Sequence, residues 1–136
     1  EMPGIDIRNT RAWEALFAAN DDPLVRSHPS LVGAFVDPDL IEMADGTVVC
    51  AFGVRISEKL CWADPSHPLN GNYLAFSLDQ GSTWSHIIQL TSGIMTTHYM
   101  AVREVAPNEL CAAYDLGAWN KPGRQACTVN VAVERT

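Results

Sequence analysis

Positive charge is scarce in this sequence, and it is not clustered. The 136 residues contain 9 Lys and Arg against 16 Asp and Glu, which gives a formal net charge of −7. Proteins that bind nucleic acids or anionic membrane surfaces neutralise phosphates with groups of basic side chains. The composition therefore argues against both kinds of partner.

Long apolar runs are absent as well. Each run is interrupted by Asp, Glu, Gly or Arg well before the roughly 20 residues that a membrane-spanning helix needs. The opening residues Glu1–Gly4 carry no basic charge of the kind that starts a signal peptide. We expect neither a membrane span nor a signal segment, and the cell compartment stays open.

Metal-binding spacings are also missing. The sequence has no C-x-x-C pair and no H-x-H or H-x-x-x-H group. Because zinc sites commonly use such spacings, we expect no metal and no other cofactor. Cysteines inside apolar runs favour buried thiols over disulfides, and their redox state stays open. The four cysteines are Cys50, Cys61, Cys111 and Cys127.

The composition of the chain and the spacing of its Gly and Pro residues indicate one mainly β domain. Hydrophobic residues make up 47% of the chain and charged residues 18%, which is enough apolar material for a packed core. Apolar residues at helical spacing predict one short helix over Thr10–Asn20, inside an N-terminal extension of residues 1–30. After this extension, Gly and Pro separate short runs rich in Val, Leu, Phe and Tyr, which predicts strands and turns over residues 31–136.

The chain contains an internal repeat. Leu40–Gly53 aligns without gaps with Val102–Asp115, at an offset of 62 (102 − 40), and both copies are typical of strand, tight turn and strand. Repeats near this length indicate successive blades of a β-propeller, although two unrelated hairpins can also share such a pattern. The identical positions are Glu42 and Glu104, Ala44 and Ala106, and Ala51 and Ala113.

The apolar patterns of the strands differ. Val48–Phe52 and Leu110–Tyr114 are continuously apolar, which predicts inner strands packed on both faces. Val129, Val131 and Val133 instead alternate with polar residues. This alternation predicts a half-exposed strand at an outer or edge position.

A compact turn motif lies between two predicted strands, where Ser77–Trp84 follows the pattern S-x-D-x-G-x-T-W. A carboxylate such as that of Asp79 can accept hydrogen bonds from turn amides, Gly81 can take a positive φ, and the Trp84 ring can pack under the hairpin. Every defined position of the motif resembles the Asp-box of the sialidase-like β-propellers. We use the name Asp-box for Ser77, Asp79, Gly81, Thr83 and Trp84.

The resemblance extends over roughly residues 30 to 134 and implies a six-bladed propeller. This chain would supply about two four-stranded antiparallel blades, residues 31–92 with the Asp-box and residues 93–136. By the same resemblance, Tyr99 matches the catalytic tyrosine nucleophile and Asp115 the acid that orients an arginine. Arg55 and Trp119 are the candidates for binding substrate. The family carries an arginine shortly before an Asp-box, whereas His67–Asn72 contains none.

Two functions follow from the resemblance. In the first, the chain is the C-terminal portion of a sialidase-like protein that hydrolyses or binds glycans, with a glycoside hydrolase preferred. In the second, it is a non-catalytic glycan- or protein-binding or structural module. Self-association of three copies, or the remainder of a longer chain, would then supply the missing blades. Asp37 and Asp39 are further candidates for acid–base work, since they flank Pro38 at a strand entrance.

Overall fold

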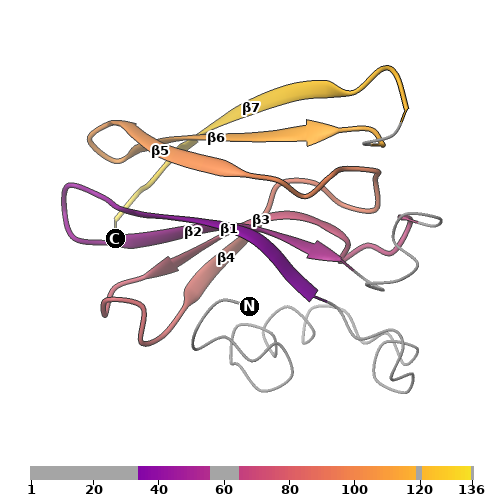
Figure 1. Ribbon diagram of the computed structural model, residues 1–136. Helices are drawn as coiled ribbons and strands as arrows, with labels where there is room; N and C mark the ends of the chain where they lie inside the picture. The colour runs from indigo at the N-terminus through magenta and orange to yellow at the C-terminus, as the bar shows by residue number, and fades with distance from the viewer. Residues whose placement is uncertain (1–33, 56–64, 119–120, 136) are drawn as a thin grey trace, which may run out of the picture.

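The computed structural model describes residues 34–55, 65–118 and 121–135 (Figure 1). The helix predicted over Thr10–Asn20 lies outside the described residues. Within them, the chain forms seven strands and no helix, so the prediction of a mainly β domain is confirmed for this part. No described helix is long and apolar enough to span a membrane.

The strands form two antiparallel sheets, and neighbouring strands follow one another along the chain. The first sheet has the order β1 (Ala34–Glu42), β2 (Val48–Arg55), β3 (Gly71–Ser77) and β4 (Ser85–Gln89). The second has the order β5 (Ala101–Ala106), β6 (Glu109–Leu116) and β7 (Gln125–Ala132).

The two sheets lie one above the other, with β5 beside β1 and β2 (Figure 1). Because successive side chains of a strand point to opposite faces, the first sheet buries two apolar layers. The layer between the sheets consists of Met43, Val49, Ala51, Leu74, Phe76, Val102, Leu110 and Ala112. The layer on the far face of the first sheet consists of Cys50, Phe52, Val54, Leu69, Tyr73 and Ala75.

The internal repeat is confirmed at the level of strand register. Leu40 pairs with Cys50 in the first hairpin, and Val102 pairs with Ala112 in the second. Each of these positions is related to its counterpart by the same offset of 62. The two hairpins are also in contact with each other. The Glu104 carboxylate accepts a hydrogen bond of 2.7 Å from the backbone amide of Ala44. The repeat therefore describes two equivalent hairpins packed side by side.

The predicted strand positions are confirmed in part. β2 is central and almost wholly buried, and β7 lies at the edge of its sheet with alternating exposure. β6 is central too, but Cys111 and Ala113 on its outer face are only partly buried. The prediction that β6 is packed on both faces was therefore wrong for the described chain, in which only one sheet covers it.

The second sheet has three strands in the part of the chain described, one fewer than a four-stranded blade requires. Within the described residues, the chain after β7 crosses toward the first sheet. The amide of Val133 donates to the carbonyl of Asn108 at 2.8 Å. Arg135 pairs with Asp45 and donates to the Thr47 hydroxyl. These contacts direct the chain away from the edge of β7.

Candidate functional site

The Asp-box forms the turn between β3 and β4 and is stabilised by its own side chains. The Asp79 carboxylate accepts bonds from the Thr83 amide at 2.8 Å, the Thr83 hydroxyl at 2.6 Å and the Ser77 hydroxyl at 2.8 Å. These bonds stabilise the ionised carboxylate and lower the pKa of Asp79. Gly81 has φ +86°, and Trp84 packs against the far-face layer. The predicted turn chemistry is therefore confirmed.

The Asp-box lies far from the candidate site residues. β3 begins at Gly71, opposite Val54 and next to the end of β2 at Arg55, and it ends at Ser77. Seven strand residues span roughly 20 Å. The Asp-box is therefore a support at one end of the first sheet, and the polar groups that could bind a ligand gather at the other.

Five polar residues meet where β2 and β6 end, and we call them the rim cluster: Asp37, Arg55, Thr96, Thr97 and Asp115. Nη2 of Arg55 lies 3.5 Å from Oδ2 of Asp37 and donates to the Thr97 carbonyl oxygen at 3.3 Å. About a fifth of the Arg55 side chain is exposed. Asp37 has φ +51°, a costly backbone conformation, beside a register shift in β1. The ion pair of Arg55 with Asp37 and the strained backbone at Asp37 thus bound the rim cluster on the side of β1.

Asp115 anchors the segment that runs across the rim. Its carboxylate accepts bonds from the Thr97 amide at 2.8 Å, the Thr97 hydroxyl at 2.6 Å and the Thr96 hydroxyl at 3.0 Å. Arg124 lies 3.9 Å from the same carboxylate. Arg55 reaches the other side of Thr97 through its carbonyl. Arg55 and Asp115 are therefore joined through Thr97, and the arginine in direct contact with Asp115 is Arg124.

His98 lies beneath the rim cluster and is 1% exposed. Its Nε2 is 3.2 Å from Oδ1 of Asn70, and its backbone has φ +67°. Burial, assisted by the charge of Arg55, lowers the pKa of His98 to about 4, against an opposing effect of Asp115. The imidazole is consequently neutral near pH 7, and it is a packed polar support of the rim.

Of the two aromatic candidates, Tyr99 and Trp119, the structure describes Tyr99. Tyr99 follows His98 and is 62% exposed, so its ring projects from the rim into solvent. None of the described side chains forms a hydrogen bond to its hydroxyl. Trp119 lies outside the described residues. The structure thus brings Arg55, Asp115 and the backbone leading to Tyr99 together, with Asp115 serving as an anchor.

Asp37 and Asp39, the other acidic candidates, do not form a carboxylate pair. Asp37 faces Arg55, whereas Oδ2 of Asp39 accepts bonds from the Val102 amide at 2.9 Å and from Arg103 at 2.6 Å. Each carboxylate thus has its own cationic partner. Asp39 links the first hairpin to the second, which is a structural role.

The two threonines of the rim cluster and Asn70 were missed by the sequence analysis. Thr96, Thr97 and Asn70 are at most 1% exposed, and each forms a side-chain bond with a residue 18 or more positions away. Threonine and asparagine in irregular segments are ordinary turn composition. The only usable signal was the polarity of Thr96–His98 immediately before a predicted strand.

Comparison with known proteins identifies no relative. No protein-family model matches the chain, and neither a curated protein nor a solved structure does. Among the described residues, no group of three His, Cys, Asp or Glu could hold a metal ion. Among the described residues, Cys111 and Cys127 are free thiols, and burial, together with the charge of Asp39, raises the pKa of Cys50 to about 12. Any functional assignment must therefore come from the rim cluster and the Asp-box.

His98 makes the stability of the fold depend on pH. Its pKa is about 4 in the folded chain against 6.5 as the reference value, so between these values the unfolded chain binds a proton and the folded chain does not. The contribution of this pKa difference to the free energy of unfolding is therefore fully present above pH 6.5 and is lost as the pH falls to about 4. The loss corresponds to about 3 kcal/mol. Chemical denaturation between pH 7 and pH 4 measures it.

The control for this pH dependence is His98→Asn. Asparagine tolerates a positive φ and does not titrate, so the variant should lose most of the stability change between pH 6.5 and pH 4. Carboxylates elsewhere in the chain contribute equally to the pH dependence of stability in both proteins. An unchanged pH profile in the variant would assign the effect to other groups.

Proposed function

We propose that this chain is a portion of a sialidase-like propeller that binds or hydrolyses glycans at the rim cluster. The observation that carries the proposal is the connection of Arg55 and Asp115 through Thr97, two residues before the exposed Tyr99. The residues that match the site by resemblance thus belong to one end of the two sheets. The hydrogen-bonded Asp-box at the other end supports the same family assignment.

The chemistry of the rim suits an acidic sugar. A guanidinium is a planar donor that matches a carboxylate, and Arg55 is placed at the surface between Asp37 and the Thr97 carbonyl. An exposed tyrosine ring offers a flat apolar face for stacking on a sugar and a hydroxyl at its edge. The ligand class is therefore a glycan that ends in a carboxylate-bearing sugar.

Hydrolysis would use Tyr99 as the nucleophile. The phenol oxygen would form a bond to the anomeric carbon while the bond to the leaving-group oxygen breaks. A carboxylate must take the phenol proton, and water must then release the sugar. Asp37, opposite Arg55, is the rim carboxylate not used to anchor Thr97. We assign it the role of proton acceptor within this proposal.

The test is turnover of a fluorogenic sialoside panel by the wild-type chain and by Tyr99→Phe. The substitution removes one oxygen from an exposed side chain, so we expect the fold to be intact and turnover to fall at least about a thousandfold. Tyr114→Phe, which removes a hydroxyl from β6, is the matched control and should keep wild-type kcat/KM. Retained turnover in Tyr99→Phe would exclude Tyr99 as the nucleophile.

A non-catalytic binding module is the second candidate. It is favoured by one observation: both oxygens of Asp115 already accept bonds from buried threonines, so this carboxylate acts as a scaffold. For this candidate, the wild-type chain binds free sialic acid in an NMR titration but turns over no sialoside. Absence of both binding and turnover would exclude both candidates.

A further inference from the structure

The edge of β7 differs from the three other sheet edges of the described chain. Exposed strand edges carry unpaired backbone donors and acceptors, and proteins usually protect them with charge, proline, a register shift or short length. β1 has Pro38 between two aspartates and a register shift. β4 has only five residues and faces a shift in its pairing with β3. β5 has Arg103, Glu104 and a register shift.

β7 has none of these protections. Its eight residues, Gln125–Ala132, contain no charged residue, no proline and no glycine, although the chain as a whole has a net charge of −7. Its pairing with β6 is regular over all eight residues. Thr128 and Asn130 are exposed, while Val129 and Val131 are half-buried toward the first sheet. This is a long, regular and uncharged edge, and no other described strand pairs with it.

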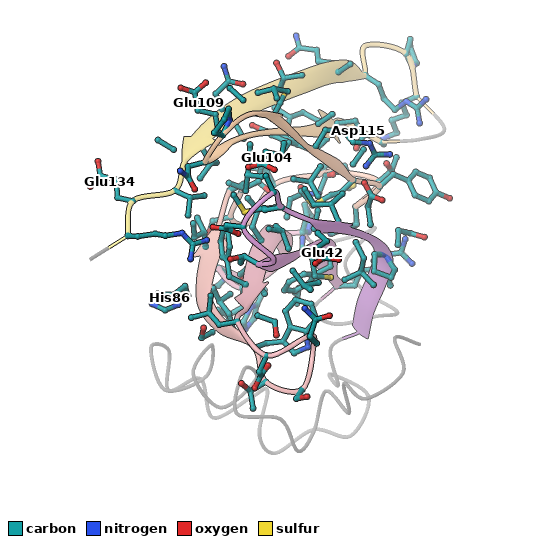
Figure 2. All side chains as sticks on the ribbon, turned by 90° about the vertical axis from the view of Figure 1, so that its left-hand side faces the viewer. Glu42, His86, Glu104, Glu109, Asp115 and Glu134 are labelled. Atoms are coloured by element: carbon teal, nitrogen blue, oxygen red, sulfur yellow. The ribbon has the colours of Figure 1, made fainter. Side chains whose placement is uncertain are left out.

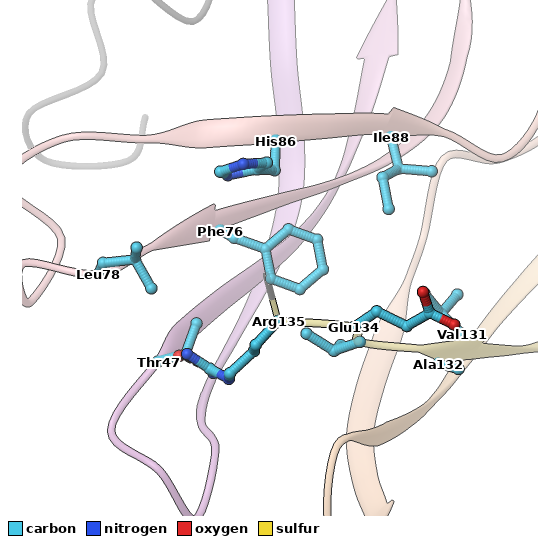
Figure 3. A pocket seen from close by; sticks show the side chains of 10 residues that line it. Thr47, Phe76, Leu78, His86, Ile88, Val131, Ala132, Glu134 and Arg135 are labelled. Atoms are coloured by element: carbon cyan, nitrogen blue, oxygen red, sulfur yellow. Dashed lines mark hydrogen bonds between the residues drawn. The ribbon is translucent and has the colours of Figure 1, made fainter.

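The space beside this edge is hollowed and lined by apolar side chains together with Thr47, His86, Glu134 and Arg135. A groove of about 350 Å³ lies between the ends of β3 and β4 and the C-terminal end of β7 (Figure 3). Phe76, Leu78 and Ile88 form one wall and Val131 and Val133 the other. Leu78 is 68% exposed and Ile88 36%. The groove follows from packing a three-stranded sheet on a four-stranded one, which leaves β4 without a strand above it.

We propose that β7 pairs with β7 of a second copy of this chain, antiparallel and across a two-fold axis, so that two three-stranded sheets become one sheet of six strands. The strand is self-complementary for this arrangement. In a register centred on Val129, Cys127 faces Val131 of the partner and Thr128 faces Asn130 of the partner. No pair brings like charges together, and inner and outer faces match.

A second copy of this chain is favoured over other binding partners because pairing of β7 with β7 continues the antiparallel ladder of β6 and β7. The partner's β7 extends the ladder that β6 and β7 form, and it brings further apolar side chains over Leu78 and Ile88. The interface is isologous and closed, so it ends at two copies. It uses neither Arg55 nor Tyr99, and it therefore does not depend on the proposed function.

The test is the molar mass of the full chain by light scattering after size exclusion, at about 100 μM, where an interface of micromolar affinity is saturated. We expect twice the 14.9 kDa of one chain. The double variant Thr128→Lys, Asn130→Lys should raise the dimer dissociation constant at least about tenfold, because each lysine would face a lysine of the partner. Both side chains are exposed, so the fold should persist.

The matched control places the same two charges on the opposite edge strand of the same sheet. Ala101→Lys, Val105→Lys changes exposed residues of β5 and should leave the dimer unchanged. Mixing the β7 lysine variant with Thr128→Glu, Asn130→Glu should restore a dimer that contains one chain of each kind, since opposite charges then face each other.

Three results would overturn the pairing of β7. A monomer at about 100 μM excludes an interface of micromolar affinity. A mass of three chains indicates a ring closed by sheet faces. A dimer that the β5 lysines weaken, and the β7 lysines do not, indicates that the outer face of the second sheet is the contact. None of these results depends on sugar binding or turnover, so each proposal can fail without the other.

Discussion

Replacing Gly53 with alanine should lower the free energy of unfolding by about 3 kcal/mol, because the new methyl group has no room. Gly53 lies in β2 against the buried His98, and a β-carbon at this position would overlap Cβ of His98 and lie 2.9 Å from its carbonyl oxygen. The obstacle is backbone as well as side chain, so a change of rotamer cannot relieve it. Urea denaturation of the two proteins measures the difference.

Gly123→Ala is the comparison that separates steric overlap from backbone strain. Gly123 has φ +91° but nothing within 4 Å of the position that a β-carbon would take. This variant should lose about 1 to 2 kcal/mol, the cost of placing an L-residue in a left-handed conformation. If Gly53→Ala is no more damaging than Gly123→Ala, the close packing of β2 on His98 is wrong.

Replacing Asp115 with alanine should also cost about 3 kcal/mol of stability, and it should release the segment that leads to Tyr99. Three donors lose their acceptor: the Thr97 amide, the Thr97 hydroxyl and the Thr96 hydroxyl. Thr96 and Thr97 are buried, and an unsatisfied buried donor costs about 1 to 3 kcal/mol. Hydroxyl groups can rotate toward other acceptors, which limits the total. Thermal unfolding and amide hydrogen exchange at Thr97 measure the two effects.

Asp115→Asn distinguishes the loss of charge from the loss of the acceptor. Asparagine keeps one carbonyl oxygen for the Thr97 amide, so this variant should retain about half of the lost stability and most of the exchange protection at Thr97. Equal damage from alanine and asparagine would mean that the ionic charge, through Arg124, is the main contribution.

The features predicted from sequence are those with local causes. The Asp-box turn was predictable because its bonds join residues at most four positions apart, within Ser77 to Thr83. The edge position of β7 was predictable because half-burial leaves alternation in the sequence. The repeat was predictable because equal register requires equal spacing of apolar positions.

The features that escaped prediction depend on distant contacts. The contact of Thr97 with Asp115 joins an irregular segment to a strand 18 positions away, and the contact of His98 with Asn70 joins two irregular segments 28 positions apart. The path of the chain after β7 depends on contacts of Val133 and Arg135 with residues in other turns. Neither kind of contact leaves a period or a motif, so composition alone gave no warning of either.

The separation of the Asp-box from the rim cluster makes the molecule easy to label. Asp115 and His86 of β4, close after the Asp-box, lie on opposite sides of the protein (Figure 2). The bonds of the Asp79 turn are completed inside the turn itself, and Gln80, Ser82 and Thr83 are exposed. Substitutions at sites this far apart generally act additively. In a chain whose native cysteines are replaced by alanine, a cysteine introduced at Ser82 can therefore carry a fluorophore or a surface tether while the rim cluster stays unmodified.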